Sequence, residues 1–312
     1  MFREMFDRRP PLSHTSKIIS SRAVTSAMNY RHIYHAGNFA DCLKHITLSR
    51  ILLYLQKKDK PYYTLDTHAG IGLYDLSSEE AQKTGEWNGG IGKLIGPSSD
   101  PLPPEIATLC APFLDVIKML NPDGQMRSYP GSPEIVQTMC REQDRAFFIE
   151  LHPDDFDLLS DNCGRDRRFF LREDDGWSAL RSDLPPLERR GLVLIDPPYE
   201  EPDEYTYMVE QFLEGYKRWS TGIYCMWYPI KARRDVDVAA QMIADAGIPN
   251  ALRAEIIINK LDTAHRLNGT GLFIINPPYT LHDELAVLLP FLAKRFGLTA
   301  QRSSLEWITP PK

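Results

Sequence analysis

The chain has 312 residues, of which 43% are hydrophobic and 25% charged, the composition of an ordinary globular protein with room for one large domain and an insertion. No uncharged apolar run reaches the roughly 18 residues that a transmembrane helix needs, so we expect no such helix. The five cysteines lack C-x-x-C spacing, which favours a reducing compartment, the cytoplasm, over a disulfide framework.

The net charge is −6, but charge is unevenly spread along the chain. Residues 1–61 carry eleven Lys and Arg against four Asp and Glu, so the remainder is strongly acidic. This basic segment would permit local contact with nucleic-acid phosphates, and a solvated basic tail explains the charge equally well. Residues 1–27 lack apolar periodicity. We expect a disordered extension there, or sequence upstream of a misassigned start, with one folded domain over 28–312.

A capped helix is predicted from Asn38 onward. Asn38 can act as the N-cap, and Asp41 stands three residues later, as in a variant of the capping box. Three lysines within Lys57–Lys60 suit the negative end of the helix dipole, and Pro61 stops the helix.

Seven short apolar runs separated by helical patterns predict an α/β fold. Several runs are continuous rather than alternating, as strands covered on both faces must be. They indicate a doubly wound, Rossmann-like sheet of seven mostly parallel strands. The connection between the last two runs is too short for a helical crossover, which predicts an antiparallel hairpin at the sheet edge. The runs are Tyr62–Asp66, Ala146–Leu151, Phe169–Arg172, Leu192–Asp196, Ile223–Tyr228, Ala254–Ile258 and Leu272–Asn276.

The gap between the first two runs is about 80 residues, whereas a simple βαβ unit needs only about 30 in total. We therefore expect a small helical insertion at about 76–127, with a helix over Glu105–Leu120. After the insertion, Ser132 as N-cap and Pro133 at the first helical position predict another helix start.

Polar residues at the ends of the first three runs suit a nucleotide-like ligand. The first run ends in an acid and a glycine-containing loop, Asp66–Gly72, that lets a ligand approach the backbone. Glu150 can hydrogen-bond a ribose diol, and Asp175 follows the third run, where an adenine amine is expected. Each signal alone also fits an ordinary turn or a solvated acid, so the argument rests on their order.

The fourth run ends in Asp196-Pro197-Pro198-Tyr199. Prolines have no N–H and a fixed φ, so their carbonyls are held out as hydrogen-bond acceptors. Asp196 adds a second acceptor and Tyr199 a flat ring face, which together suit a planar base with an exocyclic amine. The motif resembles the D-P-P-Y of S-adenosylmethionine (SAM) dependent amino methyltransferases, which act on a flipped-out base. A strand-to-loop turn with two prolines is the alternative.

Two further patterns are interpreted as structural. The motif Asn276–Tyr279 is almost a copy of the first, but after an antiparallel strand it would lie at the opposite edge of the sheet. A zinc-like spacing is also present, without a second cysteine pair, so we expect no metal. Its residues are His32, His35, Cys42 and His45.

The chain resembles the RlmJ family, bacterial 23S rRNA (adenine-N6) methyltransferases that modify adenine 2030. The resemblance covers about residues 28–310. It rests on Tyr30–His45, Leu65–Gly70, Tyr129–Pro133, Glu150–Pro153, Asp196–Tyr199, Glu214–Arg218 and Tyr224–Pro229.

The resemblance implies a SAM-dependent methyltransferase domain acting on 23S rRNA, and we expect a monomer without membrane or metal partners. SAM would be contacted by His45, His68, Ser132, Glu150, Asp175, Gly176 and Asp196. The substrate would be placed by Tyr30, His32, Pro197 and Tyr199, with Asp196, Tyr199 and Lys44 in catalysis. Two alternatives remain: a DNA adenine-N6 or cytosine-N4 methyltransferase, and a non-catalytic rRNA-binding assembly factor.

Overall fold

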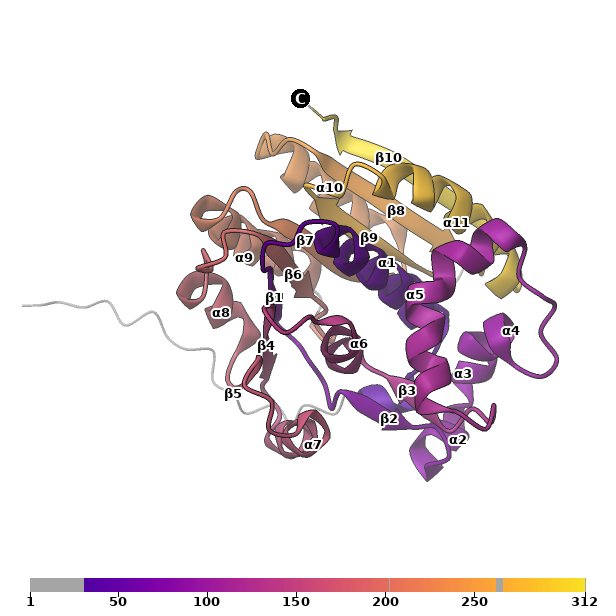
Figure 1. Ribbon diagram of the computed structural model, residues 1–312. Coiled ribbons are helices and arrows are strands. Elements are labelled where there is room, and N and C mark those ends of the chain that lie inside the picture. The colour runs from indigo at the N-terminus through magenta and orange to yellow at the C-terminus, as the bar shows by residue number, and fades with distance from the viewer. Residues whose placement is uncertain (1–30, 202, 262–265, 312) are drawn as a thin grey trace, which may run out of the picture.

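The computed structural model describes residues 31–201, 203–261 and 266–311 (Figure 1). Our expectations for residues 1–27 and for Tyr30 lie outside the described residues. The main strands are β1 (Tyr63–Asp66), β4 (Arg145–Glu150), β5 (Phe169–Glu173), β6 (Gly191–Ile195), β7 (Ile223–Ile230), β8 (Ala251–Ile257), β9 (Gly269–Ile275) and β10 (Arg302–Thr309). The helices outside residues 76–127 are η1 (His32–Tyr34), α1 (Phe39–Gln56), α6 (Ser132–Met139), α7 (Pro153–Cys163), α8 (Gly176–Ser182), α9 (Glu204–Arg218), α10 (Arg233–Asp245) and α11 (Leu281–Phe296).

The main sheet has the strand order β10-β8-β9-β7-β6-β1-β4-β5. Neighbouring strands from β5 to β7 pair in parallel, whereas β9 pairs antiparallel with both β7 and β8. The predicted mostly parallel α/β sheet and the antiparallel β8–β9 pair are confirmed.

The antiparallel strands lie at one edge of the sheet, as expected, but their order differs: β9 lies between β7 and β8, and β10, which was not predicted, pairs antiparallel with β8. The main sheet therefore has eight strands rather than seven. The sequence of β10 is largely polar and its residues are partly or fully exposed, so it lacks the apolar run that marks a covered strand.

Alternate residues of the central strands face opposite layers of helices, which Figure 1 shows on the two sides of the sheet. Leu192 and Leu194 of β6 belong to the core shared with α1, α5, α6 and α11. Val193 and Ile195 belong to the core shared with α8, α9 and α10. Both faces of β6 are covered, which explains the continuous apolar run in its sequence.

Helix α1 lies in the middle of the molecule and is buried around almost its whole circumference. Asn38 caps it as expected, because its side chain accepts from the backbone N–H groups of Ala40 and Asp41. The capping-box expectation for Asp41 was wrong: its Oδ2 accepts from the N–H of Gly37, at 2.9 Å, rather than from Asn38. The helix packs against the sheet and against α5, α6 and α11, so it needs no polar face.

Residues 76–127 lie between two short paired strands, β2 (Leu73–Asp75) and β3 (Ser128–Pro130). This segment contains α2 (Glu79–Thr84), α3 (Glu86–Gly89), α4 (Ile91–Ile95) and α5 (Pro104–Leu120). The next helix, α6, is capped by Gly131 rather than by Ser132, which is its first helical residue.

Candidate active site

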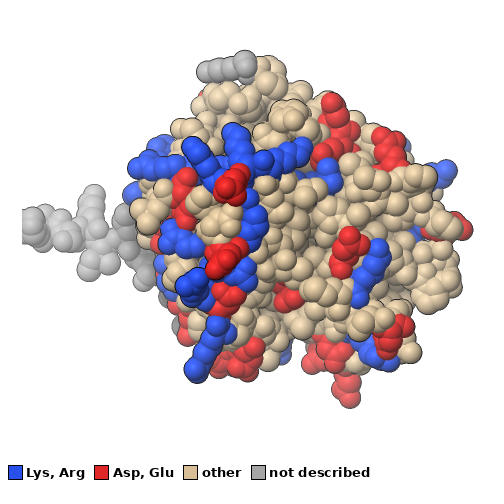
Figure 2. All heavy atoms as spheres, viewed as in Figure 1, with Lys and Arg blue, Asp and Glu red and all other residues tan. Residues whose placement is uncertain are grey.

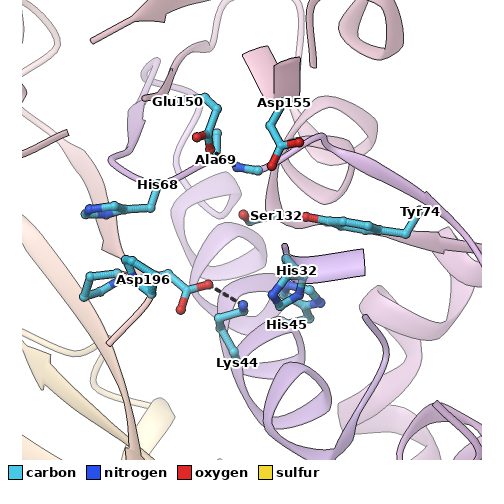
Figure 3. A pocket seen from close by; sticks show the side chains of 14 residues that line it. His32, Lys44, His45, His68, Ala69, Tyr74, Ser132, Glu150, Asp155 and Asp196 are labelled. Carbon is cyan, nitrogen blue, oxygen red and sulfur yellow. Dashed lines mark hydrogen bonds and ion pairs between the residues drawn. The ribbon is translucent and has the colours of Figure 1, made fainter. Parts of the chain in front are cut away.

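A cavity opens at the carboxyl ends of β1, β4 and β6, close to where the strand order reverses between β1 and β6, which is the usual ligand site of an open α/β sheet. Figure 3 shows how side chains from α1, α6, η1 and these strand ends converge on it. Its lining comprises His32, Lys44, His45, His68, Ala69, Gly70, Tyr74, Gly131, Ser132, Glu150, Asp155, Asp196, Pro197 and Pro198.

A second cavity of about 440 Å³ adjoins the first. Four residues line both: His32, Lys44, Asp196 and Pro198. Tyr199 and Trp227 line only the second. The Asp-Pro-Pro-Tyr motif therefore separates two adjacent spaces, and its carboxylate is accessible from each.

Lys44 is the cation at this boundary. Its Nζ forms an ion pair with Asp196 Oδ2, drawn as a dashed line in Figure 3, and a second ion pair with Asp41 Oδ1 at 2.9 Å. Burial alone would lower the pKa of Lys44, but the carboxylates of Asp196 and Asp41 hold it above its ordinary value. The ammonium therefore stays charged and keeps the Asp196 carboxylate in place.

Asp41 is a site residue that the sequence analysis missed. Its Oδ2 lies 3.0 Å from Nε2 of His32, in addition to its bonds to Gly37 and Lys44. Burial would raise the pKa of Asp41, but His32 and Lys44 hold it well below its usual range. The i, i+3 spacing of Asp41 and Lys44 was the signal available in the sequence.

The loop after β1 provides buried groups. Asp66 is fully buried, and its Oδ2 has no hydrogen-bond partner among the described residues. Burial raises the pKa of Asp66 to about 7. Burial also lowers the pKa of His68 to about 3, so the imidazole is neutral where it packs against Trp177, with ring centroids 4.7 Å apart. Gly70 adopts φ 61°, a left-handed conformation that favours glycine.

Glu150, at the end of β4, holds the adjoining backbone. Its Oε2 accepts from the N–H of Gly70 at 2.8 Å, and its Oε1 accepts from the N–H of His152 at 2.9 Å. Burial raises the pKa of Glu150 above its ordinary value. Asp155 on α7, which the sequence analysis did not single out, also lines the cavity and pairs with Arg31.

Two residues proposed for SAM binding stand behind the cavity rather than in its lining. Asp175 caps α8, its Oδ1 accepting from the N–H of Trp177 at 3.1 Å. Gly176 packs on the Thr67 carbonyl so closely that a Cβ would lie 1.8 Å from that oxygen. Both residues position Trp177, the ring that supports His68.

Tyr199 is only 5% exposed. Its hydroxyl donates to the carbonyl of Trp227 at 2.8 Å, and its ring lies 4.7 Å from that of Tyr205. Its backbone adopts φ 54°, a left-handed conformation. The ring is therefore fixed in the core, and a small part of it reaches the second cavity.

The four residues with zinc-like spacing have different partners. His32 contacts Asp41, His35 contacts Glu86, Cys42 contacts the Gly37 carbonyl and His45 contacts Tyr129. Among the described residues no group of three or more His, Cys, Asp or Glu is arranged to hold a metal ion. No helix in the described ranges is both long and apolar enough to cross a membrane.

Comparison with known proteins gives consistent matches. The family model described as "Ribosomal RNA large subunit methyltransferase D, RlmJ" matches residues 59–309. The ribosomal RNA large subunit methyltransferase J of Haemophilus influenzae is 42% identical over 91% of this chain and 99% of its own length. The protein of the same name from Escherichia coli is 40% identical over 91% and 99%. The crystal structure of protein LPL1258 from Legionella pneumophila superimposes with a TM-score of 0.78 at 36% identity, covering 87% of this chain and 98% of that one.

Proposed function

The chain belongs to the RlmJ family of ribosomal RNA large subunit methyltransferases, and from this premise we propose that it transfers a methyl group from SAM to the N6 amine of an adenine in 23S rRNA. Adenine 2030 is the target that the family resemblance implies. The observation that carries the proposal is the position of Asp196, which lines two adjacent cavities at once. One cavity would hold the methyl donor, and the other the flipped-out base.

The first cavity carries the hydrogen-bond acceptors and negative charges that suit SAM. SAM, when bound, supplies a methyl group on a positively charged sulfonium. The carboxylates of Asp196, Glu150 and Asp155 line the cavity, and the unpartnered oxygen of Asp66 is close behind. These acceptors suit the positive charges and the ribose diol. The residues proposed to hold SAM are His45, His68, Ser132, Glu150 and Asp196, with Asp175 and Gly176 as support.

The chain's own groups then act on the adenine. Asp196 and the Pro197 carbonyl accept hydrogen bonds from the exocyclic amine, which aims the nitrogen lone pair at the first cavity. The nitrogen becomes positive as its bond to the methyl carbon forms and the carbon–sulfur bond breaks. The Asp196 carboxylate stabilises that charge until the nitrogen releases a proton to water. Tyr199 forms a rigid wall for the base. Holding both reactants on either side of one carboxylate supplies much of the rate enhancement through proximity.

The test is to map N6-methyladenine in 23S rRNA from cells with and without the gene, and to measure SAM turnover on protein-free rRNA and on DNA. One adenine of 23S rRNA should lack its methyl group in the deletion strain, and the purified protein should restore it. The protein should show SAM turnover on rRNA but not on DNA. Unchanged rRNA together with methylated DNA would identify a DNA methyltransferase. SAM binding without turnover on either would identify a non-catalytic factor.

We further propose that the protein works in the cytoplasm as a monomer. All five cysteines are buried free thiols, which is expected in a reducing compartment. Light scattering of the purified protein should give a mass near 35.7 kDa at micromolar concentration.

A further inference from the structure

A third cavity, of about 360 Å³, continues the row formed by the first two. It shares Asn38 and Leu267 with the second cavity, just as the second shares Lys44 and Asp196 with the first. The three spaces therefore follow one another from the proposed SAM site, through the proposed base site, to the outside of the molecule. We call the third space the flank groove.

The flank groove lies between the insertion and the C-terminal part of the chain. Glu86 of α3 and Lys93 of α4 contribute one side. Asn259 and Arg266, from the connection between β8 and β9, and Leu298, after α11, contribute the other. The inserted helices thus extend the catalytic edge of the sheet.

The groups exposed in the flank groove suit a nucleotide. Arg266 is exposed and Leu298 is 59% exposed, so a cation and an apolar surface are both accessible. Guanidinium planes stack on unpaired bases, and lysines contact phosphates. Glu86, on the side of the groove opposite Arg266, repels an anion only weakly. Its carboxylate is bound by His35 at 3.1 Å and by Asn38 at 3.0 Å.

A flipped base stays covalently attached to the nucleotides on either side of it. An RNA whose target adenine occupies the second cavity must therefore leave that cavity as a strand, and the flank groove is a path that opens directly from it. We propose that the flank groove holds a nucleotide adjacent to the target adenine, with Arg266 stacking on its base and Lys93 contacting its phosphate. This inference rests on the proposed RNA methyltransferase function.

The experiment is a double-mutant cycle that combines the loss of one protein side chain with the loss of one RNA base. Wild type and Arg266→Ala are compared on a 23S rRNA fragment that carries the target adenine, and on fragments in which the preceding or the following nucleotide is abasic. Both kcat/KM and the Kd for RNA are measured. Because Arg266→Ala removes the stacking partner of the base, we expect it to lower kcat/KM about fivefold, mainly through KM.

The decisive result is non-additivity. Removing the base on one side should cost the wild type about as much as Arg266→Ala does, and should cost the variant little more. Additive losses for both abasic fragments would overturn the inference. A wild type that methylates no RNA at all would instead overturn the proposed function, so the two failures are distinguishable.

The matched control is Arg127→Ala, which removes an exposed arginine of the inserted segment, where it pairs with Asp123 at 2.8 Å. It lines none of the three cavities and should leave both parameters unchanged. Lys93→Ala should weaken RNA binding equally on intact and abasic fragments and reduce its salt dependence, because its contact is to phosphate. Equal SAM affinity and melting temperature in all variants would show that the fold is retained.

Discussion

A single buried carboxylate, Asp41, holds two side chains of the site at once. It fixes His32 from the segment before α1 and Lys44 within α1, and Lys44 in turn fixes Asp196. If asparagine replaced Asp41, its neutral amide could not balance the charge of Lys44. The ammonium would then be drawn to Asp196 alone, and the geometry of the site would change.

We therefore expect Asp41→Asn to lower kcat about tenfold or more while SAM affinity changes little. The measurement is single-turnover methyl transfer together with SAM titration. Combined with Lys44→Ala, the loss should be smaller than the sum of the two single losses, because both act on the same carboxylate. Additive effects with a normal melting temperature would count against a positioning role.

Asp196→Ala should abolish methyl transfer in a protein that remains folded. The interaction with the amine matters most in the transition state, so the loss should appear in kcat rather than in rRNA affinity. Lys44 keeps Asp41 as a partner in this variant, which should preserve the local packing. Activity near that of the wild type in single-turnover assays would refute the mechanism.

The buried carboxyl of Asp66 should make the folding stability of the protein depend on pH. Its pKa is raised to about 7 by burial, so its contribution to stability is present below the unfolded pKa of about 3.9 and is lost as the pH rises through about 7. Asp66→Asn, which cannot ionise, should remove that loss. The melting temperature of the variant, relative to the wild type and without SAM, should be higher at pH 8 than at pH 5. A difference that does not change with pH would show that Asp66 ionises without cost.

At the scale of elements, the direction of the preceding strand decides which of the two similar motifs lies at the candidate active site. Asp196–Tyr199 follows the parallel strand β6, whereas Asn276–Tyr279 follows β9, which runs antiparallel to β7. The second motif therefore lies at the opposite edge of the sheet, as the sequence predicts. There Asn276 bonds to the carbonyls of Ser220 and Gly222, and Tyr279 is 77% exposed beside Tyr54.

Tyr279→Ala should accordingly leave turnover on a short rRNA fragment near the wild-type value, whereas Tyr199→Ala should remove most of it. Tyr199→Phe separates the ring from the hydroxyl bond to Trp227 and should keep most activity, because the ring forms the wall. The test is to measure steady-state kinetics of the three variants and to confirm that each melts at the same temperature as the wild type. Equal damage from Tyr279→Ala would mean that the two motifs have been assigned wrongly.

Local signals in the sequence located the starts of α1 and α6 to within one residue. Asn38 was predicted and found as a cap, because an N-cap bonds within three residues. Ser132 was predicted as a cap but is the first helical residue, since Gly131 precedes the same proline and takes the extended conformation. The partly exposed β10 could not be found, because an edge strand has one neighbour and needs no apolar run.

At the scale of the whole molecule, the order of the site residues along the strands was predictable, but their contacts were not. The acids that follow the first four apolar runs locate one edge of the parallel part of the sheet. The contact between Lys44 and Asp196 spans 152 positions and depends on α1 crossing the sheet, for which the sequence holds no local signal. The family resemblance supplied Lys44 and His32, whereas Asp41 required the structure.

Net charge is also a poor guide at this scale. The chain carries −6 overall, yet Figure 2 shows Lys and Arg side chains gathered over one half of the face in view, with fewer acids among them and a mostly uncharged surface beside them. Local clusters of positive charge are compatible with binding a polyanion on a net-acidic protein.

The central position of α1 has a consequence for synthesis. The helix that carries Lys44 is made early, but it packs on β9 and α11, and Arg50 pairs with Glu284 at 2.7 Å. These partners leave the ribosome only when translation is nearly complete. A chain still being translated would therefore contain Lys44 without the surroundings that bury it, and we expect nascent chains to be inactive. We expect the protein to become able to methylate only when the last tenth of the polypeptide has been made.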